Sequence, residues 1–248
     1  LKAKNDAIDA NNDLTAEEKA QAKEDAKAKA DAAKQAIDNA TTNDAVTQAK
    51  NAGATSVDSV TPTPTAKPAA KQAIDDVLKA KNDAIDANND LTAEEKAQAK
   101  EDAKAKADAA KQAIDNATTN AAVDQAKNAG SASVSSVTPT AQAKPAAKKA
   151  IDDALADKIK EIEANNNLTD EEKAAAKQEA QDKATAAKQA IDNATTNDAV
   201  EQAKNGGATS ISSVTPTPTA KPAAKQAIDD ALKAKNDAID ANNDLTAE

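Results

Sequence analysis

The side chains whose spacing comes closest to a chemical site lie between residues 86 and 90. Asp86, Asn88 and Asp90 stand at every second position, as the first three ligands of an EF-hand calcium loop do. That loop also needs glycine at its sixth position and glutamate at its twelfth, where this chain has Leu91 and Ala97. We therefore interpret the segment as a polar turn between two helices.

Adjacent carboxylates at Glu94 and Glu95 could suggest acid–base catalysis. However, Thr92 and Glu95 are spaced like a capping box, in which a threonine hydroxyl and a glutamate carboxylate satisfy each other's backbone N–H groups. Both glutamates would then lie at the positive end of a helix dipole. We interpret them as the acidic first turn of a helix.

Lysines at 100, 104 and 106 could form a basic binding face. They alternate with acids at helical spacing, which predicts pairs such as Asp102 with Lys106 and Lys104 with Asp108. This alternation is typical of a solvated helix surface.

The composition lacks most of the side chains that enzymes use for catalysis. The chain has no His, Cys, Met, Trp, Tyr, Phe or Arg, so the usual groups for proton transfer and nucleophilic attack near neutral pH are missing. We predict that the protein is not an enzyme and assign it no catalytic, cofactor-binding or metal-binding residue and no cofactor. Its net charge of −10 argues against binding nucleic acid, and without a long apolar run we expect no membrane insertion in this segment.

A repeat of 77 residues runs through the whole chain. Residues 1–46 match residues 78–123 at every position but one. Fixed-period self-similarity is the signature of a tandem array. Because the chain begins and ends inside a repeat, we expect it to be a fragment of a longer array. The period is kept without insertion by Leu14, Leu91, Leu168 and Leu245.

Each repeat contains three amphipathic segments. The first runs from about residue 66 to 87, and the second from the turn at 88–90 to about residue 117. The inner face of the second is almost all alanine, at Ala99, Ala103, Ala107, Ala110 and Ile114. The third begins after residues 118–120 and carries the stripe Val123, Ala126, Gly130, Val134 and Val137.

Glycine inside the third segment leaves two alternatives open. Gly53, Gly130 and Gly207 either lie within a continuous helix, where glycine allows a neighbouring helix to approach, or act as a cap that ends it. The 3-4-4-3 spacing of the stripe favours the continuous helix, although Gly206-Gly207 makes the cap more plausible in the third copy.

Thr-Pro runs separate the repeats. Proline fixes its own φ and keeps the preceding residue out of the α region, so TPTPTAKP at 61–68 predicts a short, semi-stiff spacer. O-glycosylation of these threonines, or docking of a proline-reading domain, is the alternative.

These patterns predict an all-α fold of tandem three-helix bundles joined by short Thr/Pro-rich linkers, elongated overall. The expected boundaries are a first repeat lacking the start of helix one at 1–60, linkers at 61–65, 138–142 and 215–219, complete repeats at 66–137 and 143–214, and a truncated repeat at 220–248 with helix one and the start of helix two.

The unit resembles a known family of repeats. AIDAN at 84–88, LTAEEK at 91–96 and AIDNATTN at 113–120 are similar to the tandem three-helix domain-of-unknown-function repeats of Gram-positive wall-anchored surface proteins, the Ebh-like and SasC-like repeats. The resemblance implies an extracellular, wall-anchored array, attached to peptidoglycan through regions outside this segment. It also implies a role in projecting an adhesive region, in adhesion or in biofilm formation.

We accordingly expect a stalk or spacer. A multivalent module that binds a host matrix or serum protein weakly is the alternative, because repetition raises weak affinity through avidity. A third possibility is a disordered protective chain, which the exact period and the caps disfavour.

Overall fold

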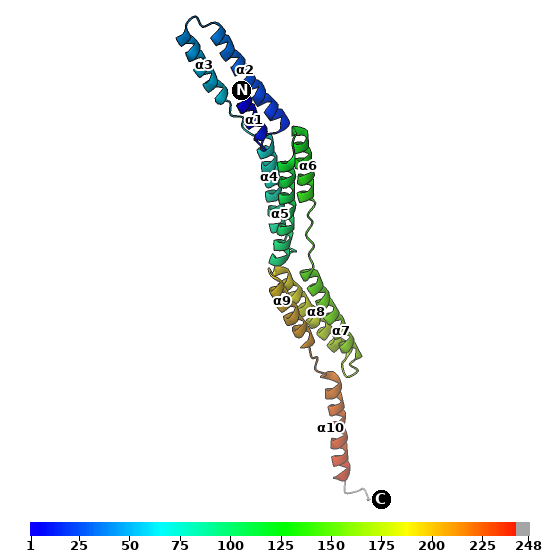
Figure 1. The fold of residues 1–248 in the computed structure, drawn as a ribbon. Helices are drawn as coiled ribbons and strands as arrows, with labels where there is room; N and C mark the ends of the chain where they lie inside the picture. The colour runs from blue at the N-terminus through cyan, green and yellow to red at the C-terminus, as the bar shows by residue number, and fades with distance from the viewer. Residues whose placement is uncertain (242–248) are drawn as a thin grey trace. The chain divides into compact units, whose positions relative to one another are not determined.

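The computed structural model describes residues 1–241, and in this range the chain forms helices and no strands (Figure 1). The expected start of helix two in the fourth copy, at 242–248, lies outside the described residues. Contacts divide the chain into unit 1, which is Leu1–Asn88 with Lys96–Pro139, and unit 2, which is Asn89–Glu95 with Thr140–Glu248. The helices are α1 (Lys2–Ala10), α2 (Ala16–Asp38), α3 (Asn43–Asp58), α4 (Ala66–Asp86), α5 (Ala93–Asn116), α6 (Asn120–Ser135), α7 (Ala143–Ala164), α8 (Asp170–Asn193), α9 (Asn197–Ser212) and α10 (Ala220–Asp240).

Three helices make one repeat, as the amphipathic pattern predicts. In the second copy, α4, α5 and α6 share one core that includes Ile74, Ile114 and Val134, all 0% exposed. In the third copy, α7, α8 and α9 share the equivalent core around Ile151, Ile191 and Ile211. The expected fold class, tandem three-helix repeats, is therefore confirmed.

Alanine forms the inner face of helix two, as expected from its spacing. The five predicted positions on α5 are all buried, and Ala103 and Ala107 are fully so. Small side chains let the neighbouring helices approach closely, and they also bury little apolar area, so helix propensity and caps must supply much of the stability.

Helix three continues through its glycine in every copy, which settles the alternative left open by the sequence in favour of the continuous helix. A Cβ atom at Gly130 would lie 2.3 Å from the Ala110 Cβ atom of α5, so only glycine allows this approach. Gly206 is different, because a Cβ atom there would meet nothing within 4 Å.

Helix three ends earlier than its apolar stripe suggested. We expected Val137 to be its last inward residue, but α6 ends at Ser135, and the Ser136 N–H donates to Ala132 and Val134 carbonyls. Pro139 explains this end, because a proline disfavours the α region for the residue before it. Val137 is buried from outside the helix.

We call the extended segments that follow helix three the connectors, at residues 60–65, 137–142 and 214–219. Along each one, exposure alternates with a period of two. In the first connector Val60 is buried, Pro62 and Pro64 are half-buried, and the threonines between them are exposed. The connector therefore packs one face on its own repeat, like a strand against helices.

The connector completes a part of the repeat that helix three does not reach. Helix α9 has 16 residues and α8 has 24, so at 1.5 Å per residue helix three is about 12 Å shorter. Val214 of the connector fills this gap and packs with Ile162, Leu168 and two alanines of α8.

Lysines hold the start of the connector. Lys106 of α5 donates to the Ser136 Oγ atom at 3.1 Å, and Lys81 of α4 donates to the Val137 carbonyl at 3.0 Å. The first copy repeats the serine contact, between Lys29 and Ser59 at 2.9 Å. The connector is thus bound to helices one and two of its own repeat.

Candidate functional site

The turn that resembles a calcium loop uses its oxygens within the fold. The Asp86 carboxylate pairs with Lys100 at 2.5 Å, and its carbonyl accepts from Lys96 at 2.8 Å. In the first copy, Asn11 stands at the position of Asn88, and its Oδ1 atom accepts from the Asp13 N–H at 2.9 Å. Nowhere in residues 1–241 do three or more His, Cys, Asp or Glu side chains gather so that they could hold a metal ion.

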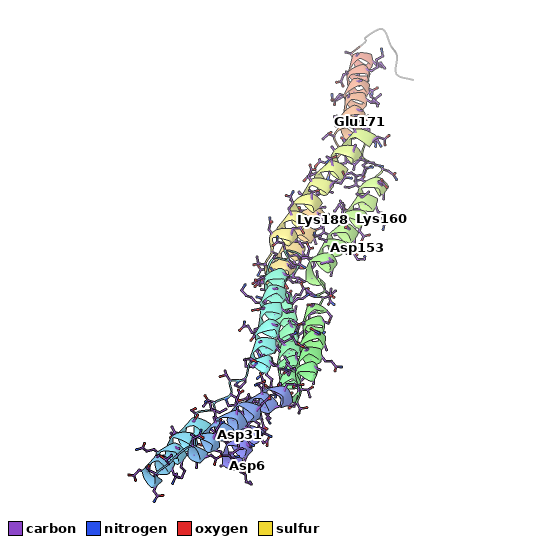
Figure 2. All side chains as sticks on the ribbon, turned by 90° about the horizontal axis from the view of Figure 1, so that it is seen from above. Asp6, Asp31, Asp153, Lys160, Glu171 and Lys188 are labelled. Carbon is purple, nitrogen blue, oxygen red and sulfur yellow. The ribbon has the colours of Figure 1, made fainter. Side chains whose placement is uncertain are left out.

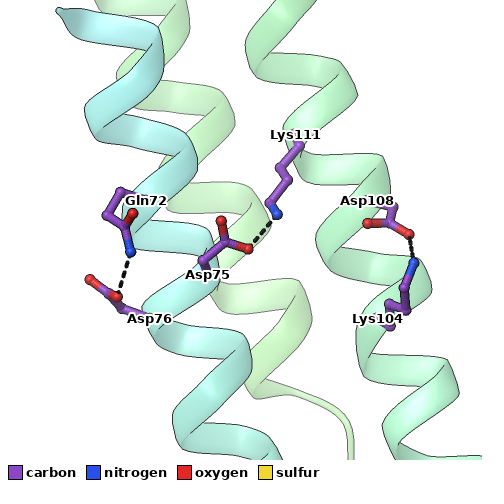
Figure 3. Close-up of polar contacts among 6 residues, drawn as sticks. All are labelled: Gln72, Asp75, Asp76, Lys104, Asp108 and Lys111. Carbon is purple, nitrogen blue, oxygen red and sulfur yellow. Dashed lines mark hydrogen bonds and ion pairs between the residues drawn. The ribbon is translucent and has the colours of Figure 1, made fainter.

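The lysines of helix two make different contacts from one another. Lys104 pairs with Asp108 at 2.5 Å, as its spacing predicts (Figure 3). The expected pair of Asp102 with Lys106 is wrong, because Lys106 reaches Ser136 instead. Asp102 accepts from Gln98 at 2.9 Å.

Ion pairs also join neighbouring helices across the surface. Figure 3 shows Lys111 of α5 directed toward Asp75 of α4. Lys188 of α8 makes the equivalent contact with Asp152 of α7, and Figure 2 labels Lys188 together with Asp153 and Lys160 of the same repeat. Exposed pairs of this kind contribute little to stability.

The most specific polar contacts lie where one repeat meets the next. We call this place the junction: it joins the helix one–helix two loop of one repeat to the N-terminal end of the next. At the first junction, within unit 1, the Glu18 Oε2 atom accepts from the Thr15 N–H at 3.0 Å and completes the capping box of α2. Its Oε1 atom accepts from the N–H groups of Thr65 and Ala66 at 2.8 and 3.0 Å.

One carboxylate therefore caps two helices that belong to different repeats. The hydroxyl of Thr65, the N-cap residue of α4, makes no cap contact within its own helix and donates to Glu18 at 2.7 Å. The same arrangement recurs for Glu95 and Glu172. Their partners in the following repeat are Gln142 and Ala143 for Glu95, and Thr219 and Ala220 for Glu172.

These hydrogen bonds keep the glutamates ionised. Burial raises the pKa of Glu18, but the N–H groups of Thr15 and Ala66 and the Thr65 hydroxyl outweigh it and lower the pKa to about 2. The hydroxyl of Thr219 leads the contacts that lower the pKa of Glu172 to about 2. The junction carboxylate thus stays charged and able to accept hydrogen bonds over nearly the whole pH range.

A buried lysine makes the reciprocal contact. Lys67, in the first turn of α4, is 5% exposed, and its Nζ atom donates to the carbonyls of Asn12 at 2.8 Å and Asp115 at 2.7 Å. Asn12 belongs to the preceding repeat, whereas Asp115 is near the C-terminal end of α5, where a cation is favourable. Lys144 makes the same pair of bonds in unit 2.

A third set of bonds joins the two loops at the junction. The Thr15 hydroxyl lies 2.7 Å from Asn120 Oδ1, and the Ala16 N–H donates to the Thr118 carbonyl at 2.8 Å. The Glu17 carboxylate accepts from the Asn120 N–H at 3.0 Å. Thr15 is 0% exposed, so the loop is closely covered.

Sequence reasoning missed this junction, although it had identified the residues. Glu94 and Glu95 were expected to be the first turn of a helix, which they are, but their contacts with the following repeat were not foreseen. The available signal was the A-K-P sequence that begins 48 residues after each capping glutamate. Only the fold shows that these two places meet.

No helix within residues 1–241 combines the length and the apolar character needed to cross a membrane.

Comparisons with known proteins agree with the repeat. The family described as Domain of Unknown Function (DUF1542) matches residues 1–65, 66–142 and 143–219, so each match includes a connector. The chain is 33% identical over 243 residues, 98% of its length, to "Extracellular matrix-binding protein EbhA" of Staphylococcus aureus strain Mu3 and to "Extracellular matrix-binding protein ebh" of strain JH9.

The chain spans only 4% and 2% of the length of these two relatives. No solved structure matches it. Three tandem matches cover most of the sequence, and the relatives are named as matrix-binding proteins rather than enzymes. The chain therefore belongs to the DUF1542 family of tandem repeats.

Proposed function

We propose that this chain is a non-catalytic structural array that acts as a stalk or spacer of a bacterial cell-surface protein. In this role it would project an adhesive region and support adhesion or biofilm formation. The protein would be extracellular and held in the wall by regions outside this segment, as the resemblance to wall-anchored proteins implies. The proposed structural units are the three-helix bundles, with residues 61–65, 138–142 and 215–219 between them.

The first junction is the observation that carries the proposal. Glu18 and Lys67 cross between two consecutive repeats, and each makes two or more hydrogen bonds there. A carboxylate capping a helix and a lysine capping carbonyls restrict how the second repeat can move against the first. Such coupling suits a spacer, which must transmit position along its length.

The packing of the connector also supports a role as a spacer. A flexible linker would be rich in glycine and serine and would leave its side chains in water. Here Val60, Val137 and Val214 are at most 8% exposed, and hydrogen bonds at Ser59 and Thr65 bound the first connector on either side. Little free chain is left at the first junction to act as a hinge.

Small-angle scattering on the 248-residue chain tests the proposal. Repeats that stand end to end should give a maximum dimension of about 120 Å or more, from the rise of 1.5 Å per helical residue. Such a rod has a radius of gyration near 35 Å, whereas a compact chain of this length would have about 18 Å. A compact particle would contradict the stalk.

A matched variant sharpens the experiment. Alanine at Glu18, Glu95 and Glu172 removes the junction carboxylates, and we expect a shorter mean dimension because the repeats can then bend. Alanine at the exposed Glu24, Glu101 and Glu179 of the same helices is the control and should leave the scattering curve unchanged.

Weak binding of matrix or serum proteins is the second candidate. It is favoured by the name of the relatives that match 98% of this chain, "Extracellular matrix-binding protein". Surface plasmon resonance against a panel of purified matrix proteins tests it. Saturable binding that strengthens when the chain is immobilised densely would support a multivalent module, and no response at any density would exclude it for that panel.

A further inference from the structure

Each connector presents a threonine at its middle whose hydroxyl is free. Thr63, Thr140 and Thr217 occupy the middle of the three connectors and are exposed. Among the described residues, their hydroxyls have no hydrogen-bond partner. These three hydroxyls are therefore available for chemistry without breaking any contact of the fold.

Other threonines of the connectors use their hydroxyls in hydrogen bonds within the fold. The hydroxyls of Thr65 and Thr219 donate to the junction glutamates at 2.7 Å. Those of Thr138 and Thr215 donate to serine carbonyls at 3.2 Å. Thr61, at the equivalent position of the first connector, is the exception, because its exposed hydroxyl also has no partner among the described residues. The free position thus recurs at the same place in each copy.

The backbone around the free threonine is extended and held in place. Pro62 and Pro64 flank Thr63 on the half-buried face, which turns the Thr63 side chain to the outside. An enzyme that modifies a side chain needs such an accessible, extended segment, because helical backbone hides its polar groups in internal hydrogen bonds.

A groove lies beside this threonine in the first repeat. It has a volume of about 620 Å³ and runs between α2 and the connector, lined by Gln21, Asp25, Lys29, Thr61 and Thr63 among others. This volume is within the range of small-molecule sites, roughly 300–1,000 Å³. A group attached to Thr63 could therefore lie against polar side chains of α2.

Charge in the groove favours a neutral group. Its ionisable side chains are two carboxylates, Glu18 and Asp25, and one lysine, Lys29, which already donates to Ser59. A phosphate would meet excess negative charge there. Sugar hydroxyls, by contrast, can donate to Asp25, which accepts from Gln21 at 3.0 Å and has further lone pairs.

We propose that Thr63, Thr140 and Thr217 are acceptor sites for O-linked glycosylation with a neutral sugar. Proline-spaced threonines are a composition that such modification uses. The Thr63 Oγ1 atom would attack the anomeric carbon of a nucleotide-activated sugar in a transferase. A carbon–oxygen glycosidic bond forms, the bond to the nucleoside diphosphate breaks with its electron pair leaving on the phosphate, and the hydroxyl proton passes to a base of the transferase.

Mass spectrometry of the protein isolated from the surface of its producing cells tests this proposal. The intact mass should exceed the sequence mass by whole hexose or N-acetylhexosamine residues, and fragmentation should locate them on the three connector threonines. A triple variant, Thr63→Val, Thr140→Val and Thr217→Val, should lose the increment while keeping the same circular dichroism spectrum.

Helical threonines provide the control. Thr55, Thr185 and Thr209 are also exposed, but each hydroxyl donates to a carbonyl of its own helix. Valine at these three positions should leave the increment unchanged. The proposal is overturned by unmodified connector peptides, by equal occupancy of the helical threonines, or by an increment that corresponds to phosphate.

Discussion

Helices α4 and α10 have the same sequence except at one position, Val77 in α4 and Ala231 in α10. Both form 21-residue helices with the same limits relative to the repeat. Their surroundings differ completely. Ile74 of α4 is 0% exposed, whereas its counterpart in α10, Ile228, is 68% exposed.

This comparison separates what a segment does alone from what its neighbours do. Helix formation in both cases follows from local features, namely alanine and lysine content and a proline in the first turn. Burial in α4 comes from α5 and α6, which share a core with it, while α10 has no buried residue. An apolar stripe thus predicts a helix face, and only a partner makes it a core.

The largest expected effect comes from truncating the two isoleucines. Ile74→Ala should lower the free energy of unfolding by about 2–5 kcal/mol, because it leaves a cavity among well-packed neighbours. Ile228→Ala should change it by no more than about 0.5 kcal/mol, as surface substitutions do. Urea denaturation followed by circular dichroism measures both, and equal losses would contradict the comparison.

Two adjacent glycines of α9 allow the same comparison of packed and open surroundings within one helix. A Cβ atom at Gly207 would lie 2.4 Å from the Ala187 Cβ atom, so Gly207→Ala should destabilise by about 1–3 kcal/mol through overpacking, less the gain in helix propensity. Gly206 faces open space, so Gly206→Ala should stabilise by roughly 1 kcal/mol. Thermal melts of the two variants should shift in opposite directions. A shift of the same sign would show that the helices can separate freely.

Removing a junction glutamate should give the next largest loss of stability. Glu95→Ala should cost about 1 kcal/mol, as the loss of a helix cap does, or about 2–4 °C in melting temperature for a chain of this size. The matched control is Glu101→Ala on the same helix, which is exposed and has no polar partner among the described residues. The coupling is weaker than the structure suggests if both variants melt alike.

Acid should remove the stabilisation that the ionised junction glutamates provide. The pKa values of Glu18 and Glu172 fall from an ordinary 4.5 to about 2 in the folded chain, so folding favours their ionised form. Their contribution is complete above about pH 4.5 and is lost as the pH falls toward about 2. The difference in melting temperature between the native chain and Glu18→Ala, Glu172→Ala should therefore shrink over this range. A difference that is independent of pH would contradict the role of the charge.

The smallest effect should be identical in the two helices compared above. Lys79 pairs with Asp83 in α4 at 2.6 Å, and Lys233 pairs with Asp237 in α10 at 2.7 Å. Both pairs are exposed and local, so packing does not alter them. Asp83→Asn and Asp237→Asn should shift the melting temperature equally and by little. A larger loss in α4 would mean that its partners strengthen the pair.

Features that depend on a few adjacent residues could be predicted well. The capping box of Thr92 and Glu95 forms as its spacing indicates, at 3.0 and 3.4 Å, and the alanine face of α5 is buried as its period indicates. The capping contacts lie within one helical turn, and the alanine face follows from the helical period, so the order of residues is sufficient to predict both.

Contacts over longer separations could not be predicted in the same way. Glu18 and Thr65 are 47 residues apart, and the regular spacing of the A-K-P sequence after each capping glutamate does not by itself show that the two segments meet. The prediction that Val137 belongs to helix three was wrong for a related reason. A valine just after the helix fits the apolar stripe as well as one inside it, and only the path of the connector distinguishes the two. Helical spacing predicted Asp102 as the partner of Lys106, but the lysine binds Ser136, which lies at the end of α6.

The sequence by itself determined the 77-residue period, the helices and the polar turns, since propensity, caps and proline act within a few residues. The tertiary structure alone decided which glycines were needed. It also decided that a proline-spaced segment packs on its own repeat and that one glutamate caps two helices. These outcomes require distant segments to meet, and burial and hydrogen bonding act only once they do.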